Sequence, residues 1–194
     1  MTQKTIIAIQ NTAKRVFAQH DYDGLSMRAL ASESGVGLSS IYHFFTDKDV
    51  LLKDVFDMTN TELGIERKKL KSRATAVQML QDRIDFQFRH MEDVVFVLKY
   101  YLHYRQDYMD LPGKILPPKA YLHIEEVLHH GISTGEFAMP NSQIETQAKI
   151  ITHSVNGFLL EYYPLIPSPA ERKKLVTELT AFIARACQYK EAPM

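Results

Sequence analysis

The segment GVGLSSIYHFFTDKDVL, residues 35–51, decides how the N-terminal part of the chain folds. It opens with two glycines around one valine, which break the helix that precedes them. The next seven residues, 38–44, carry hydroxyl, histidine and aromatic side chains, and the whole segment contains a single lysine. These residues are too polar for a buried core helix and too apolar for a loop. The mixture indicates a short helix with one face on a core and the other turned outward.

A second short helix is expected just before this segment. Ser26 can cap a helix over about 26–34, because its hydroxyl can accept a hydrogen bond from a backbone N–H of the first turn. Together with the helix over 38–44, this gives the length and the turn of a helix-turn-helix, which places its second helix in the major groove of DNA. Val36 and Ile41 would face the first helix. The side chains that would point outward are Leu38, Ser39, Tyr42 and His43.

The rest of the chain also follows helical periodicity, and no segment alternates as a half-buried strand does. We predict an all-α fold of about nine helices. A three-helix helix-turn-helix domain is expected over residues 1–48, and a larger helical bundle over 49–194. A capping box of Thr46 and Asp49 is expected to start the fourth helix near residue 47. The other expected helices span about 3–20, 26–34, 38–44, 74–90, 92–110, 118–130, 141–163 and 169–189.

Composition narrows the class of protein. The chain has 194 residues, of which 45% are hydrophobic and 24% charged, as in an ordinary globular protein. Its one cysteine cannot form an intramolecular disulfide, which fits a reducing compartment. The N-terminal residues lack the continuous apolar run of a secretory signal, and no stretch is long enough to span a membrane. We therefore expect a cytoplasmic protein with no membrane partner.

The order and spacing of a set of positions over residues 6–52 are those of a known family. These positions are Phe17, Tyr22, Ser26, Met27, Arg28, Leu30, Ala31, Gly35, Val36, Ser39, Ser40, Ile41, Tyr42, His43, Phe45, Lys48 and Leu51. With them, residues 6–52 resemble the N-terminal domain of the TetR family of bacterial transcription regulators. Farther along, only the helix layout and the GEF run at 135–137 are similar to the family. Asp21 stands where the family often has Gly, and Gly37 where it commonly has Ser or Ala; both residues are compatible with the turn or cap required. The resemblance implies a DNA-binding domain over residues 1–48 and a ligand-binding and dimerisation domain over 49–194.

The resemblance implies that helix 38–44 enters the major groove, with Tyr42 and Lys48 on phosphates. A cation in the first turn of a helix is opposed by the helix dipole unless an anion is present, which supports a phosphate at Lys48; a lysine in solvent is the alternative. Helix 38–44 has no Arg, Lys, Asn or Gln, so Arg28 is the side chain placed to reach guanine, or else to hold a phosphate. The expected DNA contacts are Ser26, Arg28, Leu38, Ser39, Ser40, Tyr42, His43 and Lys48.

The last two expected helices carry apolar seams at helical spacing, with further apolar residues off each seam. Each helix is therefore expected to bury two faces, one on its own bundle and one on a partner; a monomeric bundle core is the alternative. In the family that the chain resembles, these helices form a four-helix dimer interface. The expected interface residues are Ile144, Ala148, Ile151, Val155, Phe158, Tyr162, Leu175, Leu179, Phe182 and Ala186.

Aromatic residues are concentrated between the two ends of the chain. A ring stripe at helical spacing usually forms core, but each buried tyrosine hydroxyl needs a partner. A ligand pocket would meet that need, and the family that the chain resembles places its inducer in this region. We expect a small apolar or aromatic effector with a few polar atoms. The expected pocket residues are Phe96, Tyr100, Tyr101, Tyr104, Tyr108, Tyr121 and Phe158.

Other chemistry finds little support in the sequence. His123, Glu126 and His130 share one helical face and could ligate a metal, but the neighbouring Glu125 and His129 favour a solvated face. We expect no metal, no cofactor and no enzymatic activity. The prediction is a homodimeric, ligand-responsive transcriptional regulator, most often a repressor in this family, released from a palindromic DNA operator by its effector. The alternative is a helical small-molecule-binding protein or enzyme with a vestigial DNA-binding element.

Overall fold

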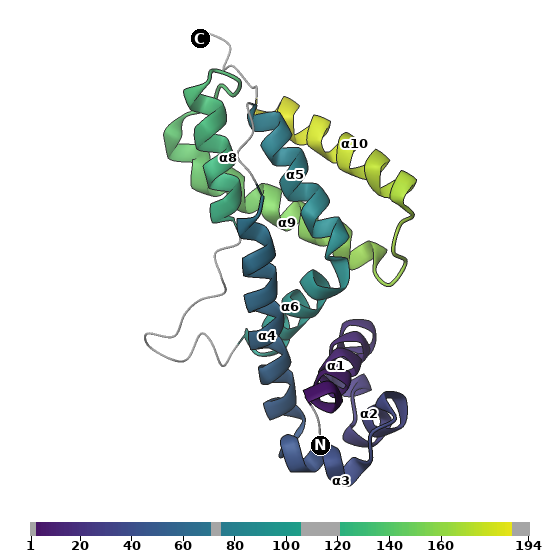
Figure 1. Ribbon diagram of the computed structural model, residues 1–194. Helices are drawn as coiled ribbons and strands as arrows, with labels where there is room; N and C mark the ends of the chain where they lie inside the picture. Colours follow the sequence, from purple (N-terminus) through teal and green to yellow (C-terminus); the bar gives the residue numbers. More distant parts are fainter. Residues whose placement is uncertain (1–2, 71–74, 106–120, 188–194) are drawn as a thin grey trace. The chain divides into compact units, whose positions relative to one another are not determined.

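The computed structural model describes residues 3–70, 75–105 and 121–187. Within these ranges the chain forms nine α-helices and one short 3-10 helix, without a strand, which confirms the all-α prediction (Figure 1). No helix of these ranges is long and apolar enough to cross a bilayer. The helices are α1 (Gln3–Gly24), α2 (Met27–Ser34), α3 (Leu38–Phe44), α4 (Lys48–Lys68), α5 (Ala76–Arg89), α6 (Met91–His103), α8 (Leu122–Ser133), η1 (Asn141–Gln143), α9 (Ile144–Tyr162) and α10 (Pro169–Cys187).

The helices divide into two compact units. The first unit comprises Met1–Glu66 and Glu92–Lys114, and the second comprises Arg67–Met91 and Ile115–Met194. α6 therefore packs with α1–α4, although α5 precedes it in the sequence and belongs to the second unit. This division describes packing, whereas the boundary expected at residue 48 separates DNA-binding from ligand-binding residues and stays a prediction.

The two short helices of the first unit begin and end where the local signals place them. The Ser26 hydroxyl caps α2 by accepting a hydrogen bond from the Ala29 N–H at 3.1 Å. α2 ends at Gly35, whose φ of 67° lies in the left-handed region that favours glycine. α3 follows Gly37 without a side-chain cap, and fully buried Ile41 anchors it on the core of the unit.

The start of α4 differs from the prediction by one residue. Asp47 Oδ1 accepts a hydrogen bond from the Val50 N–H at 2.8 Å, and the Thr46 hydroxyl donates to the other oxygen of Asp47. The bond from the Val50 N–H is the main cause of the lowered pKa of Asp47. The predicted capping box of Thr46 and Asp49 is therefore wrong. A carboxylate caps a helix N-terminus as well as a hydroxyl does, and its charge is also favoured by the helix dipole.

α6 supplies aromatic core to the first unit. The Phe96 ring meets Phe17 edge-on, with 5.4 Å between ring centroids, and Tyr100 stacks on Phe56 at 4.2 Å. Phe96 is fully buried and Tyr100 is 4% exposed. Phe96 and Tyr100 therefore belong to the hydrophobic core of the first unit, which was the alternative to lining a ligand pocket.

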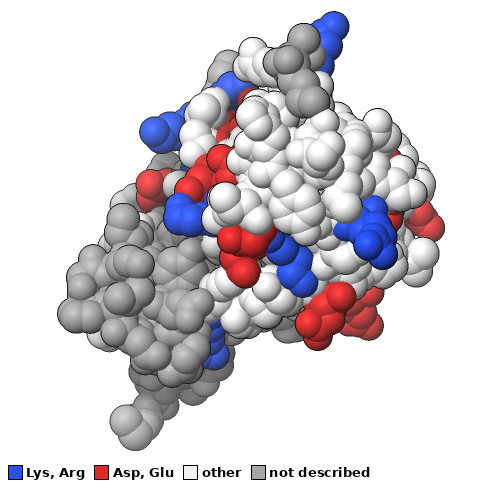
Figure 2. Space-filling model, turned by 90° about the horizontal axis from the view of Figure 1, so that it is seen from below, with Lys and Arg blue, Asp and Glu red and all other residues white. Residues whose placement is uncertain are grey.

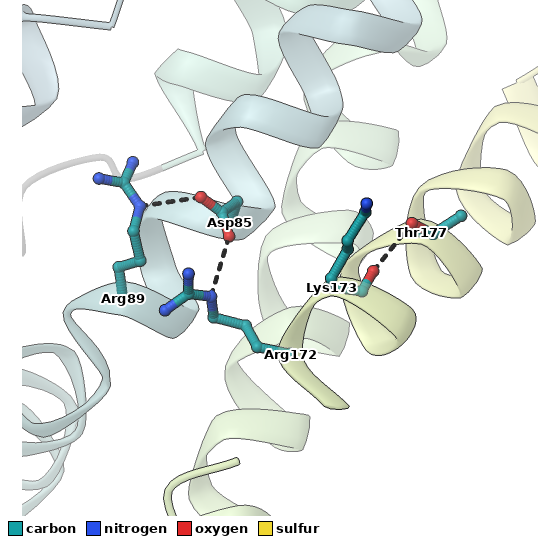
Figure 3. Close-up of polar contacts among 5 residues, drawn as sticks. All are labelled: Asp85, Arg89, Arg172, Lys173 and Thr177. Carbon is teal, nitrogen blue, oxygen red and sulfur yellow. Dashed lines mark hydrogen bonds and ion pairs between the residues drawn. The ribbon is translucent and has the colours of Figure 1, made fainter. Parts of the chain in front are cut away.

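In the second unit, α5 packs against both α10 and α8, and α8 packs against α9. Figure 3 shows a polar connection between α5 and α10: the Asp85 carboxylate accepts a hydrogen bond from Arg89 Nε at 2.8 Å and pairs with Arg172 Nε at 3.2 Å. One turn along α10 from Arg172 and Lys173, the Thr177 hydroxyl donates to the Lys173 carbonyl at 2.8 Å. Asp85 is therefore neutralised by two arginines on the α10 side of α5.

The GEF run joins three elements of the second unit. Gly135, with φ of 75°, reverses the chain after α8. The Glu136 carboxylate accepts the Ala76 N–H at 2.9 and 3.0 Å, which adds a second cap to the start of α5. Phe137 is 3% exposed, and its ring lies directly against Gly131 of α8. The similarity that this run has to the family therefore has a structural reason.

The apolar seam predicted on α9 is buried in the single chain, whereas the seam predicted on α10 is more open. Ile144, Ala148, Ile151 and Val155 are at most 5% exposed in the single chain, so they pack within their own bundle. A side chain buried in this way has little surface left for a partner. On α10 the predicted seam is the more open one, since Phe182 is 65% exposed.

Candidate DNA-binding site

The start of α2, the outward face of α3 and the start of α4 form one shallow groove in the first unit. Five of the eight side chains predicted to contact DNA line it, together with Leu25, Met27, Thr46 and Asp47. The other three, Ser39, Ser40 and His43, lie on α3 outside this lining. The five predicted side chains that line the groove are Ser26, Arg28, Leu38, Tyr42 and Lys48.

The side chains of this groove are available to a partner. Tyr42 of α3 is 50% exposed, whereas its neighbour Ile41 is fully buried. Arg28 is exposed, and its guanidinium makes no ion pair within the part of the chain that the structure describes. A guanidinium donates in a planar fork that fits either two guanine acceptors or a phosphate. The groove can therefore bind an anionic, hydrogen-bonding surface.

Charges near the groove are sparse and of both signs. Figure 2 looks at the end of the first unit that carries α3, and most of the surface there is uncharged. Lys and Arg groups stand singly on this face, with Asp and Glu beside several of them, and form no continuous basic surface. Such a face supplies few phosphate contacts, so long-range attraction to DNA is modest.

Lys48 has a structural role that the sequence did not reveal. Its ammonium donates to the carbonyl oxygens of Tyr22 at 2.9 Å and Leu25 at 3.0 Å. The nitrogen also lies 3.6 Å from the centroid of the Tyr22 ring, within cation–π distance. Since an ammonium has three hydrogens, one remains for a phosphate. Lys48 thus holds the start of α4 against the turn between α1 and α2.

Replacing Lys48 by Met is expected to lower the stability of the protein as well as its affinity for DNA. Two hydrogen bonds from a charged donor are lost, which corresponds to about 1–3 kcal/mol of unfolding free energy. Chemical denaturation followed by circular dichroism measures this change. Lys53→Met is the matched control, because the Lys53 side chain is 67% exposed and pairs with Asp57 one turn along the same helix. Equal stability of the two variants would show that Lys48 has no structural role.

A tyrosine–carboxylate cluster ties the start of α4 to α1 and to the end of α6. The hydroxyls of Tyr22 and Tyr104 donate to the two oxygens of Asp49, at 3.1 and 2.5 Å. The Tyr22 ring also stacks on His103 of α6 at 4.0 Å. Burial, followed by the Asp49 carboxylate, raises the pKa of both tyrosines, so both hydroxyls remain donors. No sequence signal indicated this cluster, because it joins residues far apart in the chain.

The residues predicted to line a ligand pocket are distributed over both units. Tyr101 on α6 and Tyr104 directly after it are half-buried in the first unit, close in sequence to the buried Phe96 and Tyr100. Tyr121 and Phe158 belong to the second unit, and Tyr108 lies outside the described residues. No group of three or more His, Cys, Asp or Glu side chains in the described ranges could hold a metal ion.

Comparison with known proteins identifies the N-terminal domain. Residues 9–55 match the model of the bacterial regulatory proteins of the tetR family. Among curated protein sequences, none matches the chain.

Solved structures share the fold along nearly the whole chain. The ketosteroid transcriptional regulator KstR2 of Mycobacterium tuberculosis gives a TM-score of 0.72 at 18% identity, over 98% of both chains. The TetR family transcriptional regulator PfmR from Thermus thermophilus gives 0.69 at 15% identity, over 99% of this chain and 100% of that chain. The fatty acid degradation regulator FadR from Bacillus halodurans gives 0.65 at 15% identity, over 95% of this chain and 96% of that chain. Residues 9–55 are therefore similar to the tetR family of bacterial regulatory proteins, and the chain as a whole shares its fold with solved structures that include a TetR family transcriptional regulator.

Proposed function

We propose that the chain is a homodimeric repressor that binds a palindromic operator and is released from it by a small effector. The observation that carries the proposal is the groove where Arg28, Tyr42 and Lys48 meet beside an outward α3. Two structural neighbours are a ketosteroid regulator and a fatty acid degradation regulator. Both names refer to largely apolar molecules, which supports an effector with an apolar body.

Each copy of α3 is expected to read only a few bases. Ser39, Ser40 and His43 can make single hydrogen bonds, and Leu38 can pack on a thymine methyl. None of these contacts gives the discrimination of a bidentate pair, so one half-site binds weakly. A second copy on a second half-site raises the affinity through effective concentration, and DNA shape adds selectivity. This argument favours a dimer on a palindrome.

The proposed dimer surface, which we call the outer α9–α10 face, comprises the exposed apolar side chains of these helices. Ile150 and Phe158 of α9 are 52% and 38% exposed, and Phe182 of α10 is 65% exposed. We infer that these side chains form one surface, because large exposed apolar side chains that lie together commonly mark an interaction site. A two-fold axis would pair this face with itself, giving a four-helix contact. The remaining candidates from the sequence are the half-buried Tyr162, Leu175 and Leu179 and the exposed Ala186.

We propose that helix α4 couples effector binding to DNA binding. It contributes Lys48–Glu66 to the first unit and its last residues, from Arg67, to the second. Its first turn holds the helix-turn-helix through Lys48 and Asp49. An effector that prefers one arrangement of the two units would therefore change the spacing of the two α3 helices in a dimer. This is a shift of population that depends on differential affinity for the two states.

Substituting Arg28 by Ala distinguishes base reading from phosphate binding at the edge of the groove. If Arg28 donates to guanine, the variant is expected to lose about 1–3 kcal/mol per half-site and to tolerate any base at one operator position. Binding to a set of operators with each position changed in turn measures this. A uniform loss across all positions would make Arg28 a phosphate contact. Arg15→Ala, on α1, is the control, because Arg15 pairs with Glu33 at 3.1 Å and lies outside the groove lining.

Fluorescence anisotropy with DNA from beside the coding region tests the proposed function. Residues 1–50 hold five basic and five acidic residues, and the groove offers Arg28 and Lys48. Two phosphate contacts from each of two subunits predict a slope of log K against log salt of roughly −4. Binding should saturate at two chains per site. Failure to bind any such fragment more tightly than random DNA would reject the proposal.

A further inference from the structure

One face of α5 brings polar and aromatic groups together inside the second unit. Arg83, Phe86, Gln87 and His90 follow one another at i, i+3, i+4 and i+7, which places them on the same side of the helix. Phe86 is 2% exposed, and the His90 ring lies 4.5 Å from it. The guanidinium of Arg67, near the end of α4, lies over the same ring at 5.5 Å from its centroid. This face of α5 therefore meets a second arginine.

The basic groups at this place have little anionic compensation. Arg83 is only 12% exposed, and its nearest described carboxylate is Glu126 of α8 at 3.5 Å. The same Glu126 oxygen is 3.9 Å from Nδ1 of His123, and the Glu126 side chain is 61% exposed. Arg67 has no ion pair in the described part of the chain. Burial, and then Arg83, lowers the pKa of Arg67; burial, and then Arg67, lowers the pKa of His123.

Other groups on α5 do not compensate the positive charge of Arg67 and Arg83. Asp85 is held by Arg89 and Arg172 on the α10 side (Figure 3). Gln87, one turn along α5 from Arg83, has a buried side-chain oxygen without a hydrogen-bond partner. A partly buried cation without a counter-ion, and a buried polar atom without a partner, both raise the free energy of the folded state. A ligand that supplies negative charge would compensate the arginines, whereas the Gln87 oxygen is an acceptor and would need a hydrogen-bond donor, which a carboxylate does not offer.

We propose that Arg67, Arg83 and His123 bind the carboxylate of an amphipathic effector whose apolar body lies beside this face of α5. Arginine suits this role because its planar fork can donate two parallel hydrogen bonds to a carboxylate. Two arginines arranged around one apolar ring discriminate an acid from the neutral molecule of the same shape. The inference rests on the proposed effector response and narrows its ligand to carboxylic acids that carry an apolar chain or ring.

Thermal unfolding of the full chain, without DNA, tests this site with two matched pairs of probes. Decanoate and phenylbutyrate carry the carboxylate, and decanol and phenylbutanol carry the same apolar body without charge. At about ten times the dissociation constant, an acid should raise the melting temperature by about 3–6 °C, and its alcohol should raise it far less. Inorganic phosphate separates a general oxyanion site from one that also needs the apolar body.

Arg67→Gln and Arg83→Gln should each abolish the shift caused by the acids. Arg67→Lys keeps the charge without the planar fork, so it should fold as wild type does and keep a reduced shift. Lys174→Gln, on α10, is the control and should respond as wild type does, because Lys174 is 76% exposed and contacts only Glu178, at 4.0 Å, among its described ion pairs.

Several results would overturn the proposal. They are an equal shift with acid and alcohol, an equal shift in wild type and in Arg67→Gln, a shift with phosphate as large as with the acids, or no shift with either acid. Operator binding is measured separately, so the site can fail while the regulatory function stands. In that case the protein would bind its DNA normally and the acids would leave its melting temperature unchanged.

Discussion

Phe182→Lys is expected to convert the protein from a dimer to a monomer and to weaken operator binding at least about 100-fold. Phe182 is 65% exposed on the outer α9–α10 face, where a two-fold axis would bring it against the same helices of a partner. A lysine there would place two like charges in an apolar contact, and their desolvation opposes association. Loss of the dimer removes the effective concentration of the second half-site, which contributes roughly 10²–10⁴ in affinity.

Analytical ultracentrifugation measures the first effect and anisotropy the second. Ile65→Lys is the matched control: Ile65 is 53% exposed on α4 and lies outside the proposed face. This variant should remain dimeric and bind the operator as wild type does. If Phe182→Lys stays dimeric at the same concentration, the outer α9–α10 face is not the interface. If it becomes monomeric and still binds with full affinity, pairing of half-sites is not the source of affinity.

Gly131→Ala is expected to cause the largest loss of stability among small substitutions. A Cβ at position 131 would lie 2.1 Å from the nearest carbon of the Phe137 ring, and two more ring carbons would lie within 2.7 Å. Phe137 is 3% exposed, so the ring has no open space into which it can retreat. Overpacking of this kind costs about 3 kcal/mol, which corresponds to a melting temperature roughly 6–12 °C lower.

The control for this prediction is Gly64→Ala in α4. A Cβ there meets nothing within 4 Å, and alanine has the higher helix propensity, so stability should rise by about 0.5–1 kcal/mol. Reducing the ring by Phe137→Leu should restore part of the stability of Gly131→Ala, because the two positions are in contact. Strictly additive effects of the two substitutions would contradict the proposed close packing of Gly131 and Phe137.

Local signals in the sequence were sufficient for the helix-turn-helix. Ser26 caps α2 and Gly35 adopts a positive φ because each needs only its immediate neighbours. The start of α4 was less certain, since Thr46 and Asp47 are adjacent residues that can both cap a helix. The structure selects Asp47, and this frees Asp49 to accept hydrogen bonds from Tyr22 and Tyr104.

Long-range packing decided what the sequence left open. The seam that contains Ile151 and Val155 has the periodicity of an interface, but periodicity does not tell which of two apolar faces meets the partner. Tyr100 similarly stacks on Phe56, a residue of α4 far away in the chain. Lys48 was expected to bind phosphate because of the helix dipole and the family resemblance. The carbonyl oxygens that it also contacts come from a turn that no local pattern connects to α4.

The most direct test of the account is footprinting of the DNA beside the protein's own coding region, with wild type and with Tyr42→Ala. Tyr42 is exposed on α3 and lines the groove, so its loss should remove binding without unfolding the chain. We expect wild type to protect a palindrome whose half-site centres lie about one helical turn of DNA, or a multiple of it, apart. Tyr42→Ala should give no protection at the same concentration. The absence of a protected palindrome with wild type at any salt concentration, or equal protection by Tyr42→Ala, would contradict the account.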